Sequence, residues 1–331
     1  MGRSQGSNDM PEKIVVTGVA GFIGSHLAER LLADGYQVVG VDSLTDYYDV
    51  RIKRANLDPL RSHPEFRFVE DSINRLDLGR LVDGASYVFH QAAQPGVRDS
   101  WGEKFEEYID SNVRATQALC EAVKNRPIKR FVYASSSSVY GETTELPMGE
   151  THPTRPVSPY GVTKLDAENM CLLYGRNYGL PVLCLRYFTV YGPRQRPDMA
   201  FHRFIRAGLS GAPLQIYGNG SQTRDFTFVD DIVEANVAAM EYGGDERVFN
   251  VGGGSRVSLS RILDVMGGLM RRELDVRYSD RQRGDVTHTF ADIALARREL
   301  GYAPATELDE GIAHEIEWVQ SVYGKLDDPT R

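Results

Sequence analysis

The sequence predicts an α/β fold built on a doubly wound parallel sheet, with a smaller C-terminal lobe. Three observations favour this class. Short apolar runs alternate with amphipathic segments through the first half of the chain, a glycine-rich loop joins the first apolar run to the first amphipathic one, and small or polar residues follow the later runs. Parallel strands need helical crossovers, so this alternation indicates a parallel sheet.

The composition is that of an ordinary globular protein. The 331 residues are 41% hydrophobic and 25% charged, which allows a substantial core. A net charge of −8 argues against nucleic acid or an anionic membrane as the main partner, although local arginines could still bind a small anion. No apolar run approaches the length of a membrane span. Residues 1–11 are polar, and we expect them to form a disordered tail.

The three cysteines are Cys120, Cys171 and Cys184. Their spacing fits neither a metal site nor a disulfide framework. We therefore expect no metal and buried thiols in a reducing, cytoplasmic compartment.

A glycine-rich loop lies between the first strand and the first helix. Residues 13–17 are predicted to form a buried strand, and a helix is predicted from Ser25, with its C-terminal cap at Gly35. Glycines between them would let a pyrophosphate approach the backbone and the N–H groups of the helix start. An ordinary strand-to-helix turn could carry the same glycines, so the context decides. The predicted dinucleotide contacts are Gly18, Gly21, Phe22, Ile23 and Gly24.

The second predicted strand, residues 38–41, ends in Asp42. A carboxylate at this distance from the glycine loop can accept both ribose hydroxyls of an adenosine, and it would repel a 2′-phosphate. NAD is therefore favoured over NADP, although Asp42 could instead cap a helix or lie in a solvated turn. Residues 43–59 are expected to be a loop with a short helix.

Polar and small residues follow the third and fourth predicted strands, residues 66–69 and 87–90. A carboxylate after the third strand could bond an adenine amine or only cap a helix. The alanines after the fourth strand leave room for a nucleotide to lie against the backbone. Alternatively, they could be small only because the protein packs tightly there. The contacts predicted here are Asp71, Ser72, Gln91, Ala92 and Ala93.

A fifth strand, residues 130–134, follows a helix predicted over 110–124 and leads into four serines, residues 135–138. A sixth strand is predicted over 181–186. The serines would lie at the carboxyl edge of the sheet, where open α/β sheets bind ligands. For one or two of them, a turn that satisfies local backbone groups is the alternative.

Tyr160 and Lys164 are four residues apart, so on a helix they share one face. A nearby ammonium and a positively charged nicotinamide ring would both lower the pKa of the phenol. Tyr160 could then act as the general base toward an alcohol, with a proton shared by Ser136. The pair occurs often by chance, but here it follows a dinucleotide loop and a serine run. The predicted catalytic residues are Ser136, Tyr160 and Lys164.

From residue 187 onward the pattern loosens into turns rich in proline and glycine, with helices predicted over 231–240, 259–270 and 293–300. A cleft between two lobes is where a substrate would bind. The expected organisation is a tail over 1–11, a cofactor domain over 12–187 with a returning segment over 229–255, and a substrate lobe over 188–228 and 256–331.

These motifs resemble the extended short-chain dehydrogenase/reductase family of sugar-nucleotide enzymes. The matching segments are residues 17–24, Asp42, 135–141, 160–164, 185–188 and 224–231. The resemblance implies a Rossmann-type sheet, tightly bound NAD, a nucleoside diphosphate sugar as substrate and a homodimer. It also places Tyr187 at the cofactor.

Two departures narrow the branch. Dehydratases of the family have Thr-Asp-Glu where this chain has Ser136 to Ser138, and decarboxylases of nucleotide glucuronate have Glu at the position of Ser138. The segment over 186–200 looks most like UDP-glucuronate 4-epimerase, whereas UDP-galactose epimerases have Asn at the position of Thr189. A UDP-glucuronate decarboxylase and a UDP-glucose/galactose 4-epimerase remain alternatives, and a non-catalytic NAD-binding sensor is a more remote one.

A hexuronate substrate imposes a particular requirement. Oxidation at C4 creates a ketone β to the carboxylate, which loses CO2 if the two groups align. Thr189 and Arg196 could prevent this alignment by holding the carboxylate, Arg196 through paired N–H bonds; an exposed turn is the alternative for Arg196. At the nucleotide, either Arg281 or Arg283 could face the phosphates. The predicted substrate contacts are Ser137, Ser138, Thr189, Arg196, Gln215, Tyr217, Arg224, Arg281 and Asp285.

Overall fold

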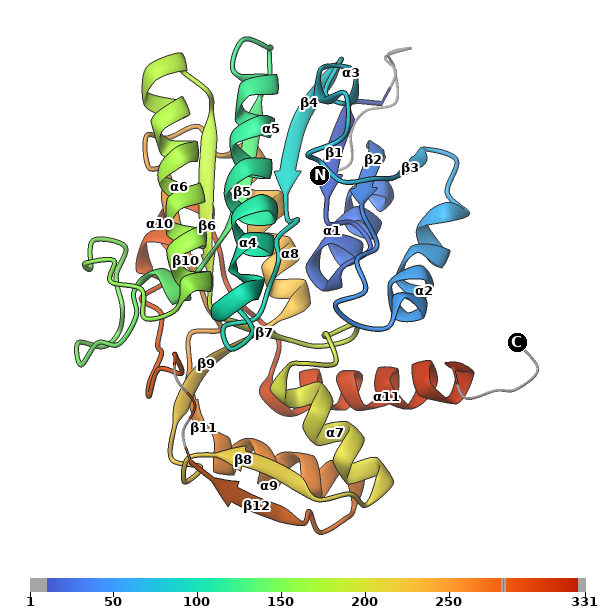
Figure 1. Cartoon of the computed structure of the whole chain (residues 1–331), viewed down its shortest axis with the longest axis vertical. Coiled ribbons are helices and arrows are strands. Elements are labelled where there is room, and N and C mark those ends of the chain that lie inside the picture. Colours follow the sequence, from blue (N-terminus) through green and yellow to red (C-terminus); the bar gives the residue numbers. More distant parts are fainter. Residues whose placement is uncertain (1–10, 281, 283, 327–331) are drawn as a thin grey trace.

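The largest element of the fold is a seven-stranded sheet with the order β10-β6-β5-β4-β1-β2-β3 (Figure 1). The structure, a computed structural model, describes residues 11–280, 282 and 284–326. All six pairings in this sheet are parallel, which confirms the predicted doubly wound class. The strands are β1 (Lys13–Thr17), β2 (Gln37–Asp42), β3 (Phe66–Glu70), β4 (Ala85–His90), β5 (Arg130–Ser136), β6 (Val182–Tyr187) and β10 (Val248–Val251).

Helices cover both faces of this sheet, because successive side chains of each strand point to opposite sides. Ile14 and Val16 pack with one set of helices, and Val15 packs with the other. The first set is α1 (Phe22–Ala33), α2 (Val50–Arg61) and α8 (Val229–Glu241), and the second is α3 (Leu78–Leu81), α5 (Ala115–Val123) and α6 (Pro159–Tyr178).

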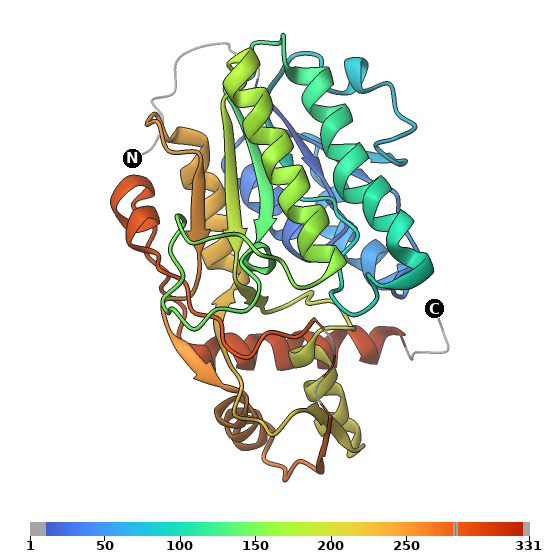
Figure 2. The same ribbon diagram turned by 60° about the vertical axis from the view of Figure 1, so that its left-hand side comes forward.

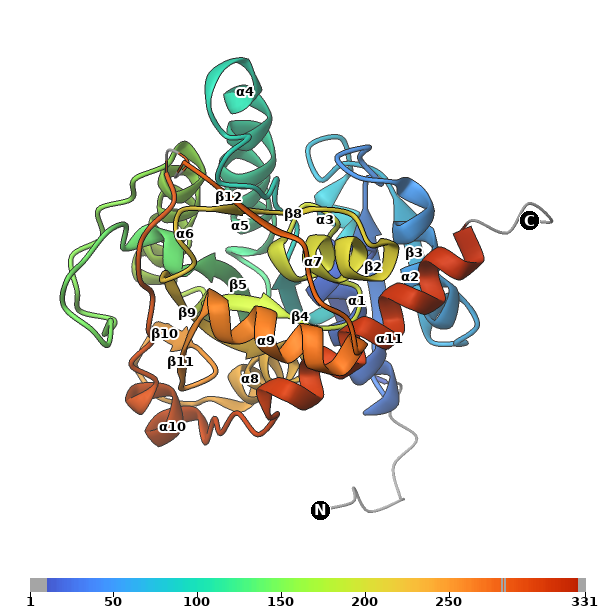
Figure 3. The same ribbon diagram turned by 90° about the horizontal axis from the view of Figure 1, so that it is seen from below.

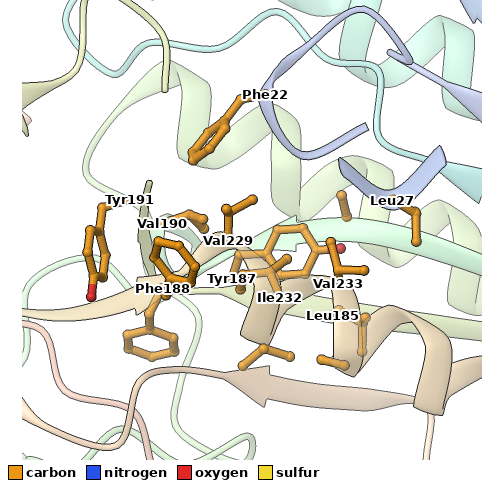
Figure 4. Packing of buried hydrophobic residues seen from close by; sticks show 14 of the residues in the cluster. Phe22, Leu27, Leu185, Tyr187, Phe188, Val190, Tyr191, Val229, Ile232 and Val233 are labelled. Carbon is orange, nitrogen blue, oxygen red and sulfur yellow. The ribbon is translucent and has the colours of Figure 1, made fainter. Parts of the chain in front are cut away.

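The hydrophobic core on the first face of the sheet includes the contact between β6 and α8. Figure 4 shows Val229, Ile232 and Val233 of α8 beside Leu185 of β6, with Leu27 of α1 nearby. This packing carries α8 back onto the sheet, so β10 can pair with β6.

A smaller lobe lies below the carboxyl edge of the sheet (Figure 2). Strand β8 pairs with β12, and a second small sheet has the order β11-β9-β7. Helix α11 contacts α7 and α9, and Figure 3 shows these three helices together from below. The elements are β7 (Thr189–Tyr191), α7 (Ala200–Ser210), β8 (Leu214–Tyr217), β9 (Thr223–Phe228), β11 (Arg256–Ser258), α9 (Leu259–Met270), β12 (Val276–Ser279), α10 (Ala294–Leu300) and α11 (Leu308–Leu326).

Several element predictions need correction. Helix α1 begins at Phe22, three residues before Ser25, because the glycine turn is tight enough for the helix to start inside the loop. Helix α2 is a full helix capped by Asp49, whose carboxylate accepts a bond from Arg51 N, where a loop with only a short helix was expected. Helix α11 and the short strands β7, β8, β9, β11 and β12 were not predicted.

Within the described residues, no helix is both long and apolar enough to cross a membrane. The same residues contain no cluster of three or more His, Cys, Asp or Glu side chains that could hold a metal ion.

Candidate active site

Two adjoining cavities lie at the carboxyl edge of the sheet. The first has a volume of about 240 Å³ and follows the glycine loop. The second has a volume of about 820 Å³ and lies between the sheet and the smaller lobe. Tyr160, Tyr187 and Arg196 line both, so these side chains lie where the two cavities meet.

The structure brings the predicted residues together around these cavities. The first cavity is lined by all the predicted cofactor residues: Gly18, Gly21, Phe22, Ile23, Gly24, Asp42, Asp71, Ser72, Gln91, Ala92, Ala93, Tyr160, Lys164 and Tyr187. The second is lined by Ser136, Ser137, Ser138, Thr189, Arg196, Gln215, Tyr217, Arg224 and Asp285. Arg281 and Arg283 lie outside the described residues, so the register between them stays open.

The glycine loop provides a cradle for phosphates. Gly18 has φ +70°, and a Cβ there would lie 2.8 Å from the backbone N of Ala92, so only glycine fits between the ends of β1 and β4. No side chain caps α1 at Gly21. The first N–H groups of this helix are therefore available to an anion, as a dinucleotide pyrophosphate requires.

Asp42 ends β2 beside this loop. Its Oδ2 accepts a bond from Ala20 N at 3.1 Å, and its Oδ1 accepts one from Leu44 N at 2.9 Å. Burial raises the pKa of Asp42, against the lowering effects of the two N–H bonds and of Lys53. Each carboxylate oxygen has a second lone pair, so Asp42 could still accept ribose hydroxyls.

Helix α6 carries Tyr160 and Lys164 one turn apart, with its N-terminus capped by Ser158. The Lys164 side chain is buried, and its Nζ lies 4.4 Å from the ring centroid of Tyr133. Burial lowers the pKa of Lys164 to about 8.

The phenol of Tyr160 differs from the prediction in its electrostatics. Burial raises its pKa, while a hydrogen bond with Ser136 and the positive charge of Arg196 act in the opposite direction. Arg196 is therefore a cation that favours the Tyr160 phenolate.

The serine run divides into two uses. Ser135 donates to Glu168, which also pairs with Arg186 through Oε1 to Nη2 at 2.6 Å. Ser136 Oγ accepts a bond from Ser138 N at 3.1 Å and bonds Tyr160. Ser136 is thus the serine that satisfies a local backbone group while it faces the phenol, and Ser135 bonds a distant side chain on α6.

Asn112 is a buried residue behind the site that the sequence analysis did not identify. It lies in a π-helical turn, Ile109–Arg114, and its Oδ1 accepts a bond from Gln94 N at 2.7 Å. Its Nδ2 donates to Thr163 Oγ1 at 3.0 Å. Asn112 therefore ties the loop after β4 to α6. The available signal was an Asn inside a predicted helix, where this residue type is unfavourable.

In the larger cavity, Arg196 forms an ion pair with Asp198. Arg196 Nε donates to Asp198 Oδ1 and Nη2 donates to Oδ2, both at 3.0 Å. Burial would lower the pKa of Arg196, but Asp198 raises it overall. Arg196 is therefore not the exposed turn residue of the alternative interpretation. Asp198 was missed because aspartate two residues from an arginine is common on surfaces.

Elsewhere in the larger cavity, Arg224 donates to the carbonyl of Val286 at 2.7 Å, so it holds the chain segment that carries Asp285. Asp285 Oδ2 accepts a bond from Arg98 Nη2 at 2.7 Å. The Arg98 guanidinium also lies 4.2 Å from the ring centroid of Tyr217. Arg98 had not been predicted, because nothing in the chain order places it beside the C-terminal lobe.

Comparison with known proteins agrees with this geometry. Residues 14–252 match the model of the NAD-dependent epimerase/dehydratase family. The chain is 42% identical over 316 residues to a Bacillus subtilis (strain 168) protein named uncharacterized UDP-glucose epimerase YtcB, with 94% of this chain and 99% of that one covered. It is 37% identical over 308 residues to the UDP-glucuronate 4-epimerase of Thermodesulfobacterium geofontis (strain OPF15), with 92% and 95% covered.

A solved structure shares the whole fold. The UDP-glucuronic acid 4-epimerase of Bacillus cereus, in complex with UDP-glucuronic acid and NAD, superimposes with a TM-score of 0.91 at 41% identity. The match covers 94% of this chain and 100% of that one.

Proposed function

Since the chain belongs to the NAD-dependent epimerase/dehydratase family, we propose that it is an NAD-dependent UDP-sugar 4-epimerase that interconverts UDP-glucuronate and UDP-galacturonate. The observation that carries the proposal is the position of Arg196, which lines both cavities beside Tyr160. A cation at this point can meet the carboxylate of a hexuronate whose C4 hydroxyl faces the phenol. The relatives named UDP-glucuronate 4-epimerase support the same substrate.

The residues around the smaller cavity fit NAD. The uncapped start of α1 would hold the pyrophosphate, and Asp42 would accept the adenosine ribose hydroxyls. When bound, NAD+ would supply an acceptor for the hydride of the sugar C4 and, once reduced, a donor for its return. Because the cofactor is regenerated each time, it need not leave the protein.

The chain's own residues would move the proton. Tyr160, assisted by Ser136, removes the proton of the C4 hydroxyl as the C4–H bond breaks, and it returns that proton after the 4-keto sugar has turned over in the site. Arg196 favours the phenolate. Lys164, one turn along α6 and lining the same cavity as Tyr160, would place its ammonium on the cofactor side of the phenol.

The larger cavity would hold the UDP-sugar between the two lobes. Ser137, Ser138 and Thr189 lie at its sugar end, and Gln215, Tyr217, Arg224 and Asp285 lie toward its nucleotide end. Holding the carboxylate away from alignment with the C4 ketone would prevent loss of CO2. We accordingly assign the cofactor lobe to residues 12–187 with the returning segment 229–255, and the substrate lobe to the described residues of 188–228 and 256–331.

The test is incubation of the purified protein with UDP-glucuronate without added cofactor, with the products separated by chromatography. UDP-galacturonate is the expected product. UDP-xylose would instead indicate a decarboxylase. Conversion of UDP-glucose to UDP-galactose, with UDP-glucuronate left unchanged, would favour the second candidate, which the relative named for UDP-glucose supports. No conversion of either sugar would leave a non-catalytic NAD-binding protein.

We further propose a homodimer in a reducing, cytoplasmic compartment. Leu173 and Val162 lie exposed on α6, with exposed Phe105 at the start of α4 (Phe105–Tyr108). The three cysteines are buried and unbonded, with Cys120 Sγ and Cys171 Sγ 4.0 Å apart. Such a pair is typical of proteins in reducing compartments.

A further inference from the structure

We propose that Asp198 is a positioning residue that gives this site its preference for a carboxylated sugar, by fixing the orientation in which Arg196 presents its free N–H groups. The inference rests on the proposed function, since it concerns the sugar that reaches Arg196. It assigns a role to a residue that belongs neither to the proton-transfer group nor to the cofactor cradle.

The geometry of the pair leaves half of the guanidinium available. The Asp198 carboxylate accepts two hydrogen bonds from one edge of the Arg196 guanidinium, one from Nε and one from Nη2, each at 3.0 Å. A guanidinium has five N–H groups, so two on Nη1 and one on Nη2 remain. Among the described residues the Arg196 guanidinium has no other hydrogen-bond partner. The remaining Nη1 and Nη2 groups form a second fork, which matches a second carboxylate.

The backbone around the pair is anchored, so side-chain orientation is the freedom that Asp198 removes. Gln195 is buried, and its Nε2 donates to Val190 O at 3.0 Å while its Oε1 accepts a bond from His202 N at 3.0 Å. The preceding Arg194 donates to Glu29 on α1 at 2.8 Å. Arg196 therefore extends from a fixed segment toward the cavities.

A fixed fork changes what the arginine selects. The Asp198 charge offsets that of Arg196, so a substrate carboxylate gains from the two aligned hydrogen bonds rather than from net attraction. A bidentate pair requires the guanidinium and the carboxylate to be aligned. A freely rotating guanidinium would lose conformational entropy on binding, whereas one already held by Asp198 would lose less. A hydroxymethyl group, as in UDP-glucose, cannot accept both N–H groups in this way. Loss of Asp198 should therefore weaken binding of the acidic sugar selectively.

The same fork would hold the carboxylate out of alignment with the C4 ketone. If the carboxylate aligns, the C5–C6 bond breaks, CO2 leaves, and the electron pair forms an enolate of the C4 ketone, which takes up a proton at C5. A loosened Arg196 should therefore also allow CO2 release.

The experiment compares wild type with Asp198→Asn, Asp198→Glu and a matched control. Asn keeps the size of Asp198 but lacks its charge and one acceptor. The control is Asp275→Asn, since Asp275 forms an exposed ion pair with Arg277, also two residues away and at 3.0 Å. For each, KM and kcat are measured with UDP-glucuronate and UDP-glucose, together with released CO2.

For Asp198→Asn we expect KM for UDP-glucuronate to rise at least about tenfold, KM for UDP-glucose to change less than about twofold, and CO2 release to increase. Asp198→Glu should restore part of the preference, and Asp275→Asn should match wild type. An equal rise for both sugars would mean a merely structural role. A lower KM for UDP-glucuronate would mean that Asp198 competes with the substrate, and unchanged constants would mean no role; each of these results overturns the inference. Wild type that does not convert UDP-glucuronate would instead overturn the proposed function first, and this inference with it.

Discussion

Arg98 Nη2 lies 2.7 Å from Asp285 Oδ2, and this contact joins the loop after β4 to the segment after β12. The Arg98 guanidinium also lies over Tyr217, 4.2 Å from the ring centroid. All three side chains line the larger cavity. The cavity is thus bridged by a charged contact between the sheet and the smaller lobe, at the end where we place the nucleotide.

Replacement of Arg98 by alanine should weaken substrate binding without slowing the chemistry. The ion pair is partly exposed, so it contributes only modestly by itself. Loss of both the ion pair and the cation–π contact with Tyr217 should raise KM for the UDP-sugar about tenfold. We expect kcat to stay within about threefold, because Arg98 is remote from Tyr160 in its contacts. Steady-state kinetics check this, with Arg126→Ala, which breaks the exposed pair with Asp83, as the control. A fall in kcat at unchanged KM would show that Arg98 serves the chemical step.

Tyr160→Phe should abolish turnover but leave the fold and cofactor binding intact. The hydroxyl is the proposed proton acceptor, so its removal should lower kcat by about 10² to 10⁴. The matched control is Tyr178→Phe at the exposed end of the same helix. Product formation is followed by chromatography, and bound NAD is measured after denaturation. A Tyr160→Phe enzyme with near wild-type kcat would mean that another group takes the proton.

The parts of the fold set by local sequence could be predicted. The glycine spacing and the alternation of side chains located β1 and the phosphate cradle, and the periodicity of residues 259–270 gave the bounds of α9. Glycine spacing and hydrophobic periodicity depend only on neighbours in the sequence, because turn geometry and amphipathic faces are local properties. The short strands β7 and β9 were missed because three to six residues carry little periodic signal, and they form by pairing with each other.

The same distinction applies to the candidate site. Tyr160 and Lys164 were found because a helix places residues four apart on one face. Arg98 and Asn112 were not found, because each acts through a tertiary contact, and Asp198 was not found, because its local pairing with Arg196 matters only where the fold places that arginine at the cavities. The electrostatics of the phenol have the same origin, since only the folded chain brings the charge of Arg196 close to Tyr160.

The stability of the protein should depend on pH through His90. This buried ring bonds Thr17 Oγ1 through Nδ1 at 2.7 Å and Thr116 Oγ1 through Nε2 at 2.9 Å. Burial, aided by the charge of Lys164, lowers its pKa to about 3. Below pH 6.5 the unfolded chain binds a proton that the folded chain does not, so stability is lost as the pH falls, by about 2 kcal/mol from this residue at pH 5.

Urea unfolding at pH 5, 6, 7 and 8 measures this dependence. His90→Gln should be less stable at pH 8, because the bonds to both threonines change, yet it should lose less stability on acidification than wild type. Equal slopes for the two proteins would contradict the assignment of the pH dependence to His90.

Leu173→Arg should convert the proposed homodimer into a monomer. Leu173 and Val162 are 53% and 40% exposed on α6, and eleven residues, about three helical turns, place them on one face. Exposed apolar side chains on one face of a long helix favour association with a second copy. The control is Leu269→Arg, which adds the same charge at a similarly exposed leucine on α9 in the smaller lobe. Sedimentation velocity should give half the wild-type mass for Leu173→Arg and the wild-type mass for the control, with circular dichroism unchanged in both. Wild-type mass for Leu173→Arg would exclude this face of α6 as the interface, and loss of the dimer only in Leu269→Arg would move the interface to α9.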